Sequence, residues 1–462
     1  MERLSLINPV DGRYSKQTKP LKDYFSEAAL IKYRIIVECE YFLYLAKQKG
    51  VKIKKLKSSD INFIKSLKNP SSHDIKEVKK IETEGNPSLP ATRHDVKAVE
   101  YYLKSKFAEQ GLSNFSEYLH FALTSEDTNN ISYTMMLSSA LKKVLLPQIK
   151  TIQKHLLNLS KEYSGSILLA RTHGQAAIPT TFGKEFRIYE NRIKTQLNRV
   201  NKIKILSKLN GAAGNYNAHI AAFPKIDWLR FSENFINHLN TEFKLNISTN
   251  KITSQIEPHD SYCELFDALC AINIILTDMC QDIWRYISDD LLTQKAAKGE
   301  IGSSTMPHKI NPISFENAEG NLGIANALFR HFSLKLPISR LQRDLSDSTV
   351  ERNFGVAFAH SLIAYDSILK GLLRIKVNPA KAAQQIAEHP EIYAETIQTI
   401  LRRENFPNPY ELLKTLTRGS KINRIKLNKF VKNLKVSKKI KKEIISSINT
   451  GYIGIADKIA KN

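Results

Sequence analysis

The chain has 462 residues, of which 42% are apolar and 25% are charged, and its formal net charge at pH 7 is +24. This composition is ordinary for a soluble globular protein, and the length suits two or three domains. No apolar run reaches the length of a membrane span, and the N-terminus has no apolar signal segment. We therefore expect a cytoplasmic protein without a membrane partner.

The positive charge raises the question of a nucleic-acid partner. Lysines are spread along the chain, and in the richest run, 421–442, apolar residues alternate with the cations at roughly helical spacing. A solvated helix face explains that pattern, and no zinc-finger or other nucleic-acid-binding signature accompanies it. We therefore expect no nucleic-acid partner, and we have no functional explanation for the excess of lysine.

Helical periodicity dominates the chain, whereas strand-like alternation is scarce and short. Gly50 and Gly111 end two of the periodic segments, and Pro147 predicts a kink inside a third. Apolar residues recur at helical spacing over 21–50, 94–111, 128–165, 179–211, 260–288 and 311–337.

Long helices without sustained heptads predict an all-α protein built around a long-helix bundle. We expect three helical domains: an N-terminal domain over 1–111, a central long-helix bundle over 112–365 and a C-terminal cap over 366–462. The 4 cysteines stand without a CxxC pair or a matching histidine cluster, so we expect reduced thiols and no metal site.

One interruption of the helical pattern is the loop 289–310, which leads into GSSTMPHKINP at 302–312. We expect Asn311 to cap the next helix, with Pro312 in its first turn. The N-terminus of that helix and the charge of Lys309 would suit a carboxylate or phosphate, although a plain loop explains the residues equally well. A serine of this loop could act as a base if nearby N–H groups and a cation stabilised its alkoxide.

A second group of polar residues surrounds His173, in LARTHGQAAIPTTFGKE at 169–185, shortly before a predicted helix. Histidine is the natural proton donor near neutral pH. A lone histidine is more often structural, so both interpretations stay open at this point.

Three further segments contain candidate site residues. In HFALTSEDTNN at 120–130, Thr124 and Ser125 are neutral groups suited to a carboxylate, while helix capping by Ser125 is the plain alternative. His94 lies at another predicted helix start. In SRLQRDLSDSTVERN at 339–353, arginines accompany hydroxyl side chains, which fits phosphate recognition or a surface ion-pair network equally well.

Together these segments resemble the fumarase/aspartase superfamily of lyases. The superfamily signature GSSxMPxKxNP is complete at 302–312, and similar motifs stand at 124–130, 171–175 and 214–219. The resemblance extends over nearly the whole chain. It implies the fold of that superfamily, which is all-α with three helical domains and a central bundle of long helices.

Within the superfamily, the chain resembles most closely the bacterial branch that acts on succinylated purine nucleotides. His308 stands where fumarases carry Gly, aspartases Ala and argininosuccinate lyases Gln. PVDGRY at 9–14 is similar to the phosphate-binding segment of that branch, and 253–260 and 343–350 are similar to its nucleotide site. Ala176 departs from the pattern, which usually has Pro there, and we expect little effect.

The resemblance implies β-elimination of fumarate from two succinylated nucleotides, without a metal or an organic cofactor. It makes Ser303 the general base that removes a proton next to a carboxylate, and His173 the general acid at the leaving nitrogen. Ser304, Lys309 and Asn311 would hold the carboxylates of the substrate.

The resemblance also implies a homotetramer in which three chains build each site around a small nucleotide substrate. The other substrate contacts that it implies are Arg13, Tyr14, Ser348 and Arg352 at the phosphate; Arg93, His94 and Asp95 along the nucleotide and succinyl group; Thr124 and Ser125 at a succinyl carboxylate; and Gln255, Ile310, Asn317, Arg343, Thr349, Val350 and Glu351 around the pocket.

Two alternatives remain. One is another lyase of the superfamily, such as an argininosuccinate lyase or a carboxymuconate cycloisomerase, but the arginine-rich segment and PVDGRY favour a phosphorylated substrate. The other is a helical scaffold that has lost catalysis. Because such a scaffold has no physical need for Ser303 and His173, their presence favours an enzyme.

Overall fold

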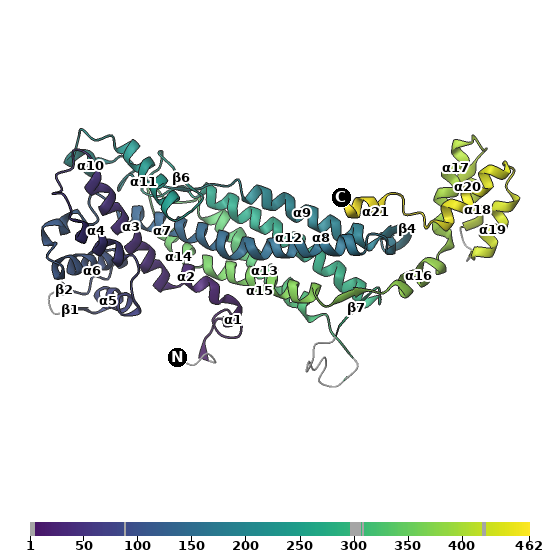
Figure 1. Ribbon diagram of the computed structural model, residues 1–462, viewed down its shortest axis with the longest axis horizontal. Helices are drawn as coiled ribbons and strands as arrows, with labels where there is room; N and C mark the ends of the chain where they lie inside the picture. Colours follow the sequence, from purple (N-terminus) through teal and green to yellow (C-terminus); the bar gives the residue numbers. More distant parts are fainter. Residues whose placement is uncertain (1–4, 87–88, 296–305, 307–308, 418–421) are drawn as a thin grey trace. The chain divides into compact units, whose positions relative to one another are not determined.

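The computed structural model describes residues 5–86, 89–295, 306, 309–417 and 422–462 (Figure 1). Helices make up most of the described chain, and the strands within it are short and lie in two-stranded sheets. The all-α fold predicted from the sequence is therefore confirmed. None of the described helices is both long and apolar enough to span a membrane.

The contacts divide the chain into two compact units. The first unit contains Met1–Gln148, Gln196–Ile274 and Gly320–Asp366, and the second contains Ile149–Thr195, Ile275–Glu319 and Ser367–Asn462. The division falls within five long helices, which are α8 (Leu146–Glu162), α9 (Phe182–Val200), α12 (Asp260–Ser288), α13 (Ile313–Lys335) and α15 (Phe354–Leu372). The division into three domains at 111 and 365 stays a prediction.

The N-terminal part of the first unit packs around α3 (Glu27–Lys47). This helix begins at Ser26, whose hydroxyl accepts a hydrogen bond from the amide of Ala29 at 3.1 Å. Its apolar side chains join a buried cluster in which the rings of Phe42 and Phe107 meet edge to face, with centroids 5.2 Å apart. The neighbouring elements are α1 (Ser15–Thr18), η2 (Lys19–Leu21), α2 (Lys22–Phe25), α4 (Ser58–Leu67), α5 (Ser72–Thr83), β1 (Gly85–Asn86), β2 (Leu89–Pro90), α6 (Asp95–Glu109) and η3 (Ser113–Tyr118).

Helix α7 (Ser125–Ala140) lies in the interior of the first unit, and every residue from Glu126 onward is buried. A π-helical segment, η4 (Leu141–Leu145), continues it into α8. The wider π turn ends two residues before Pro147, where the sequence predicted a kink, and it leaves room for a proline ring that an α-helical turn would crowd. The unit also contains β5 (Ile205–Ser207), α10 (Asn217–Ala222), α11 (Trp228–Glu242), β6 (Ile247–Thr249) and α14 (Ser346–Glu351).

The long helices of the second unit are joined by polar contacts. The amide of Gln153 on α8 donates to Glu190 on α9 at 2.8 Å, and the hydroxyl of Tyr189 on α9 donates to Asp282 on α12. The indole of Trp284 on α12 donates to Glu316 on α13 at 3.0 Å. This part of the chain forms the bundle of long helices that the sequence predicted (Figure 1).

The C-terminal helices of the second unit form a buried apolar cluster of their own, with Ile397, Leu427 and Ile444 fully buried. Leu169 from a β-hairpin joins the same cluster. The elements of this part are β3 (Ile167–Thr172), β4 (Gln175–Thr181), β7 (Leu292–Gln294), β8 (Ile375–Val377), α16 (Pro379–Glu388), η5 (Pro390–Tyr393), α17 (Ala394–Arg403), α18 (Pro409–Thr417), α19 (Arg424–Asn433), α20 (Lys438–Asn449) and α21 (Ala456–Lys461).

Candidate active site

The N-termini of α6 and α7 meet in the first unit. His94 caps α6, where its Nδ1 accepts the amide of Lys97 at 3.3 Å, and its Nε2 lies 3.3 Å from the hydroxyl of Ser125 at the start of α7. Thr124 is the N-cap of α7, and its amide donates to Asp127 at 2.9 Å. Two helix N-termini and two hydroxyls therefore lie together, which suits an anionic group.

Asp95 lies at the start of α6, and its carboxylate forms ion pairs with two arginines. Its Oδ2 is 2.7 Å from Nη2 of Arg34 and 3.2 Å from Nη2 of Arg352. Burial pushes the pKa of Asp95 upward, but the charge and hydrogen bond of Arg34 outweigh burial, and the pKa lies below its usual value. Arg34 also donates to Asn129 at 2.8 Å, so it fixes α3 against α7. Sequence reasoning missed Arg34, whose only signal was a charge within an apolar helical pattern.

Arg343 joins the two segments that resemble a nucleotide site. Its Nη1 donates to Oε1 of Gln255 at 3.3 Å, and its Nη2 lies 3.1 Å from Oε2 of Glu126. The hydroxyl of Ser254 also donates to the carbonyl of Gln342 at 2.9 Å. The segments 253–260 and 340–352 are therefore adjacent in the first unit.

Arg352 faces a cavity of about 380 Å³ in the same unit. Val10 and Asp11 from PVDGRY line that cavity together with Arg352, and so does Asn8 just before the motif. The Arg352 guanidinium also donates hydrogen bonds to the carbonyl and hydroxyl oxygens of Ser348. Two segments with a predicted phosphate-binding role, PVDGRY and the one around Arg352, therefore line the same cavity.

The remaining candidates of the first unit differ in exposure. Arg13, Arg93 and Thr349 are exposed, and Arg13 lies 5.9 Å from the ring of its neighbour Tyr14. Val350 and Glu351 are 8% and 3% exposed, so their side chains are turned into the interior.

A buried ion pair that sequence reasoning missed supports these segments. Lys208 and Asp127 lie 2.9 Å apart and are both fully buried. The Lys208 ammonium also donates to the carbonyls of Gly211 at 2.9 Å and Gln255 at 2.7 Å. The pair therefore ties the loop before GNYNAH to α7 and to the predicted nucleotide segment.

His173 belongs to the second unit and occupies a tight turn. It links β3 to β4 together with Gly174, because Thr172 pairs with Gln175 in the antiparallel register. Both turn residues have positive φ, 53° for His173 and 77° for Gly174, as a type I′ hairpin turn requires. The imidazole is exposed at the tip of this hairpin. The sequence suggested a position shortly before a helix and missed the hairpin.

The signature segment enters α13, also in the second unit. Helix α13 begins at Ile313, and the carbonyl of Pro312 accepts the first amides, from Phe315 and Glu316 at 3.0 and 3.3 Å. The helix thus begins about one residue later than the expected cap at Asn311.

Four other candidates of this segment are described. Lys309 and Ile310 are exposed, and the carbonyl of Ile310 accepts a hydrogen bond from Gln294 at 3.2 Å. Asn311 is half-buried, and Asn317 accepts a hydrogen bond from Ser367 at 2.9 Å. Ser303 and Ser304 lie outside the described residues.

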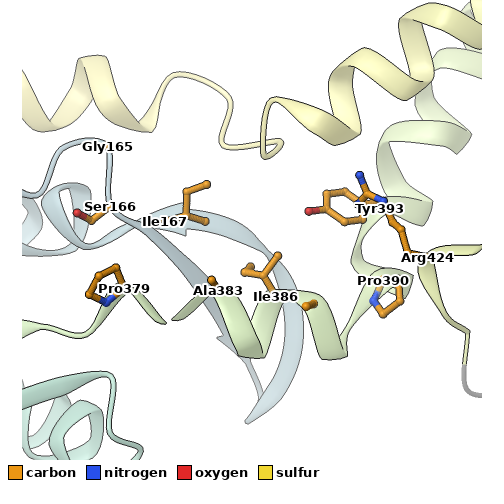
Figure 2. A pocket seen from close by; sticks show the side chains of 10 residues that line it. Gly165, Ser166, Ile167, Pro379, Ala383, Ile386, Pro390, Tyr393 and Arg424 are labelled. Atoms are coloured by element: carbon orange, nitrogen blue, oxygen red, sulfur yellow. The ribbon is translucent and has the colours of Figure 1, made fainter. Parts of the chain in front are cut away.

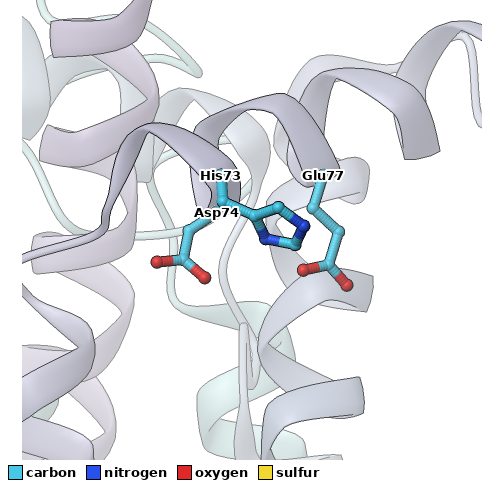
Figure 3. Close-up of side chains that lie close together, drawn as sticks. All are labelled: His73, Asp74 and Glu77. Carbon is cyan, nitrogen blue, oxygen red and sulfur yellow. The ribbon is translucent and has the colours of Figure 1, made fainter.

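One group of potential metal ligands occurs among the described residues. His73, Asp74 and Glu77 on α5 have ligand atoms within 4.8 Å of one another (Figure 3). The carboxylate of Asp74 already accepts hydrogen bonds from the amide and hydroxyl of Ser71 and from Tyr102. Helix capping therefore accounts for Asp74, and Glu77 pairs with Lys106 at 3.4 Å, so the group carries no prediction of a metal.

An apolar cavity of about 630 Å³ lies in the second unit (Figure 2). Ile167, Ile386 and Tyr393 line it, together with Arg424, whose guanidinium lies 5.1 Å from the Tyr393 ring. Arg424 also donates to Asn449 at 2.9 Å. None of the predicted site residues lines this cavity.

Comparison with known proteins gives matches over nearly the whole chain. Residues 12–325 match the family model described as "Lyase", and residues 339–453 match the one described as "Adenylosuccinate lyase C-terminal". Adenylosuccinate lyase of Legionella pneumophila (strain Corby) is 45% identical over 99% of this chain and 98% of its own length. The enzyme of Dictyostelium discoideum is 44% identical over 98% and 97%, and that of Escherichia coli (strain K12) is 43% identical over 99% and 98%.

Solved structures agree with the fold. A fumarate lyase from Mesorhizobium sp. BNC1 has a TM-score of 0.73 at 14% identity, covering 96% of this chain and 97% of its own. A 3-carboxy-cis,cis-muconate lactonizing enzyme from Pseudomonas putida has a TM-score of 0.71 at 17% identity, covering 96% and 95%. At these identities the likeness concerns the fold alone.

Proposed function

The chain belongs to the adenylosuccinate lyase family of the fumarase/aspartase superfamily, and we propose on that basis that it splits adenylosuccinate into AMP and fumarate. In the same way it splits the succinyl-aminoimidazole carboxamide ribotide into fumarate and the carboxamide ribotide, in purine biosynthesis. The observation that carries this proposal is the full-length identity of 43–45% to enzymes of that name. The complete signature at 302–312 supports it.

The proposed chemistry is a β-elimination that breaks a carbon–nitrogen bond. Ser303 removes a proton from the carbon next to a carboxylate, and that carboxylate takes up the extra electron pair as an aci-carboxylate. The pair then forms the double bond of fumarate, while His173 protonates the leaving nitrogen. Lys309 and the N-terminus of α13 supply the positive potential that stabilises the dianion.

In this proposal, residues of the first unit bind the substrate and residues of the second unit transfer protons. In the first unit, Arg352 and Ser348 bind the phosphate, and Thr124 and Ser125 at the start of α7 bind a carboxylate. In the second unit, the His173 hairpin and the signature segment carry the proton transfers. The exposure of His173 supports this role, because an acid that meets a substrate needs an open side chain.

We also propose that the protein is a cytoplasmic homotetramer in which three chains build each site. The resemblance to the superfamily supports this assembly, in which segments of different chains complement one another. No metal or organic cofactor takes part in the proposed elimination, since the substrate carboxylate itself accepts the electron pair.

Substrate specificity tests the proposal against the other lyases of the superfamily. We would compare kcat/KM for fumarate release from adenylosuccinate, the succinylated ribotide and argininosuccinate, and for lactonisation of carboxymuconate. We expect turnover of the two succinylated nucleotides alone, because the guanidinium groups of Arg343 and Arg352 would favour a phosphorylated substrate. Preferred turnover of argininosuccinate or carboxymuconate would overturn the proposal.

A further inference from the structure

The first unit contains a buried group of acids beside the candidate nucleotide site. Four carboxylic side chains are between 1% and 4% exposed, and an arginine and a fully buried histidine face them. We call this group the buried acid cluster, and its members are Glu126, Glu257, Asp347, Glu351, His259 and Arg343.

The charges of the cluster do not balance if every acid is ionised. Four carboxylates would face Arg343 and, when it is protonated, His259. An excess of two negative charges in the interior would cost several kcal/mol for each ion, because burial removes the hydration that stabilises a charge. The cluster therefore has to retain protons on its acids at neutral pH.

Two of the acids accept a backbone hydrogen bond that stabilises their charged form. Oε2 of Glu257 accepts the amide of His259 at 2.7 Å, and Asp347 accepts the amide of Ser348. Glu351 lies 3.5 Å from Nε2 of His259. The amide hydrogen bonds favour the charged form of Glu257 and Asp347, although burial is the larger effect and raises the pKa of both. Oε1 of Glu351 has no hydrogen-bond partner.

Glu126 has no comparable support. Both of its carboxylate oxygens are buried and lack a hydrogen-bond partner. One of them lies 3.1 Å from Nη2 of Arg343, but the contact does not have the geometry of a hydrogen bond. Glu126 is thus the member of the cluster whose charged form gains least.

We propose that Glu126 is a neutral carboxylic acid in the folded protein, and that it positions Arg343 at the nucleotide site without neutralising the guanidinium charge. An ionised Glu126 would draw Arg343 into a tight buried pair. A neutral Glu126 fills the same space and leaves the cation able to bind an anionic group of the substrate. The role of Arg343 in this inference rests on the proposed function, whereas the proton on Glu126 does not.

The titration of Glu126 agrees with this geometry. Burial, and after it the charge of Glu351, raise the pKa of Glu126 to about 8, against the opposing effect of Arg343. The titratable and charged groups around Glu126 come from three elements. Its own helix contributes Asp127, which pairs with Lys208. The segment before and within α12 contributes Glu257, His259 and Tyr262, and the segment around α14 contributes Arg343, Asp347 and Glu351.

Infrared difference spectroscopy of the full-length protein tests the proton directly. We would subtract the spectrum of Glu126→Gln from that of the unsubstituted protein at pH 7. We expect the carbonyl band of a protonated carboxylic acid, shifted in D2O and lost as the pH rises above about 8. A carboxylate band in place of the acid band at pH 7 would overturn the proposal. This result does not depend on which substrate the enzyme uses.

Kinetics of the same variant test the positioning role. Because Gln resembles a protonated Glu in shape and charge, we expect Glu126→Gln to keep KM within about twofold at pH 7. The matched control is Asp347→Asn, since Asp347 also contacts Arg343, at 3.7 Å from its Nε, and in addition accepts the amide of Ser348. We expect that variant to raise KM with little change in kcat.

A tenfold rise in KM for Glu126→Gln, with its fold unchanged by circular dichroism, would contradict the positioning role. If the unsubstituted protein did not cleave adenylosuccinate, the affinity for AMP, measured by calorimetric titration, would replace KM. The failure of the proposed function and the failure of this inference are therefore distinguishable.

Discussion

The backbone of His173 adopts a left-handed conformation that residues other than glycine rarely adopt. A φ of 53° in a two-residue turn is unusual for histidine, and Gly174 beside it has the same handedness. Such backbone conformations persist where the surrounding structure holds them, and they are concentrated at functional sites. The β3–β4 pairing holds this one, and it presents the imidazole at the tip of the hairpin.

Substitution of the proposed acid tests its role. We expect His173→Asn to lower kcat by about 10²–10⁴-fold while KM changes much less, because the imidazole acts only when the nitrogen leaves. Steady-state kinetics with adenylosuccinate measure both constants. A variant that differs only in KM would make His173 a binding residue.

Substitution of the proposed base is a separate test. We expect Ser303→Ala to abolish most turnover, by about 10²–10⁴-fold in kcat, and to leave substrate binding largely intact. Calorimetry with adenylosuccinate measures the binding that remains. An unchanged kcat would move the base to another group, of which Ser304 is the next candidate.

At this scale the sequence identified the residues with specific motifs and missed their partners. His173, Ser125 and Arg343 became candidates because their segments resemble those of known lyases. Arg34, Lys208 and Glu126 were missed because their importance comes from contacts with residues distant in the sequence. A single sequence shows that a charge is present, but it does not show which partner buries it.

At the scale of elements, periodicity predicted the long helices well and the hairpin poorly. Helix α12 covers Asp260–Ser288, which is the segment that apolar spacing predicted. The β3–β4 hairpin was missed because its burial does not alternate cleanly along β3, and a bulge near Leu169 breaks the register. A His-Gly pair between two apolar runs was the available signal for the turn.

The loop of GNYNAH supplies a test at this scale. Gly214 has a φ of 78°, and a Cβ there would lie 2.1 Å from the carbonyl oxygen of Thr253. We expect Gly214→Ala to destabilise the fold by more than about 1 kcal/mol, since it is both strained and crowded. Denaturant unfolding measures the change.

The matched control is an exposed glycine within a helix. A Cβ added to Gly320 on α13 would have no neighbouring atom within 4 Å, so it would meet open space. We expect Gly320→Ala to be neutral or stabilising by about 0.5–1 kcal/mol. Equal destabilisation by both substitutions would contradict the role of the Gly214 contact.

At the scale of the whole molecule, the sequence predicted the fold class and the chemistry more firmly than the assembly. Family resemblance covers nearly the whole chain and implied the fold, whereas the individual helices were predicted from apolar periodicity. The charge of +24 stays without a functional explanation. The homotetramer also stays a proposal, because complementary surfaces are not visible in the pattern of a single chain.

Mixing two inactive variants tests the shared sites. If each site takes its acid and its base from different chains, tetramers mixed from His173→Asn and Ser303→Ala subunits contain some sites with both groups intact. We therefore expect activity to return after the two proteins are dissociated and reassembled together. Each variant reassembled alone is the control, and no recovery in a mixed tetramer would place both groups on one chain.

The most direct test of the central claim is the stoichiometry of the products. Purified protein is mixed with adenylosuccinate, the change in ultraviolet absorbance is followed, and AMP and fumarate are quantified separately. The proposed β-elimination predicts one AMP and one fumarate for each adenylosuccinate consumed, without an added metal or cofactor. A folded protein that leaves adenylosuccinate intact, or that releases AMP without fumarate, would contradict it.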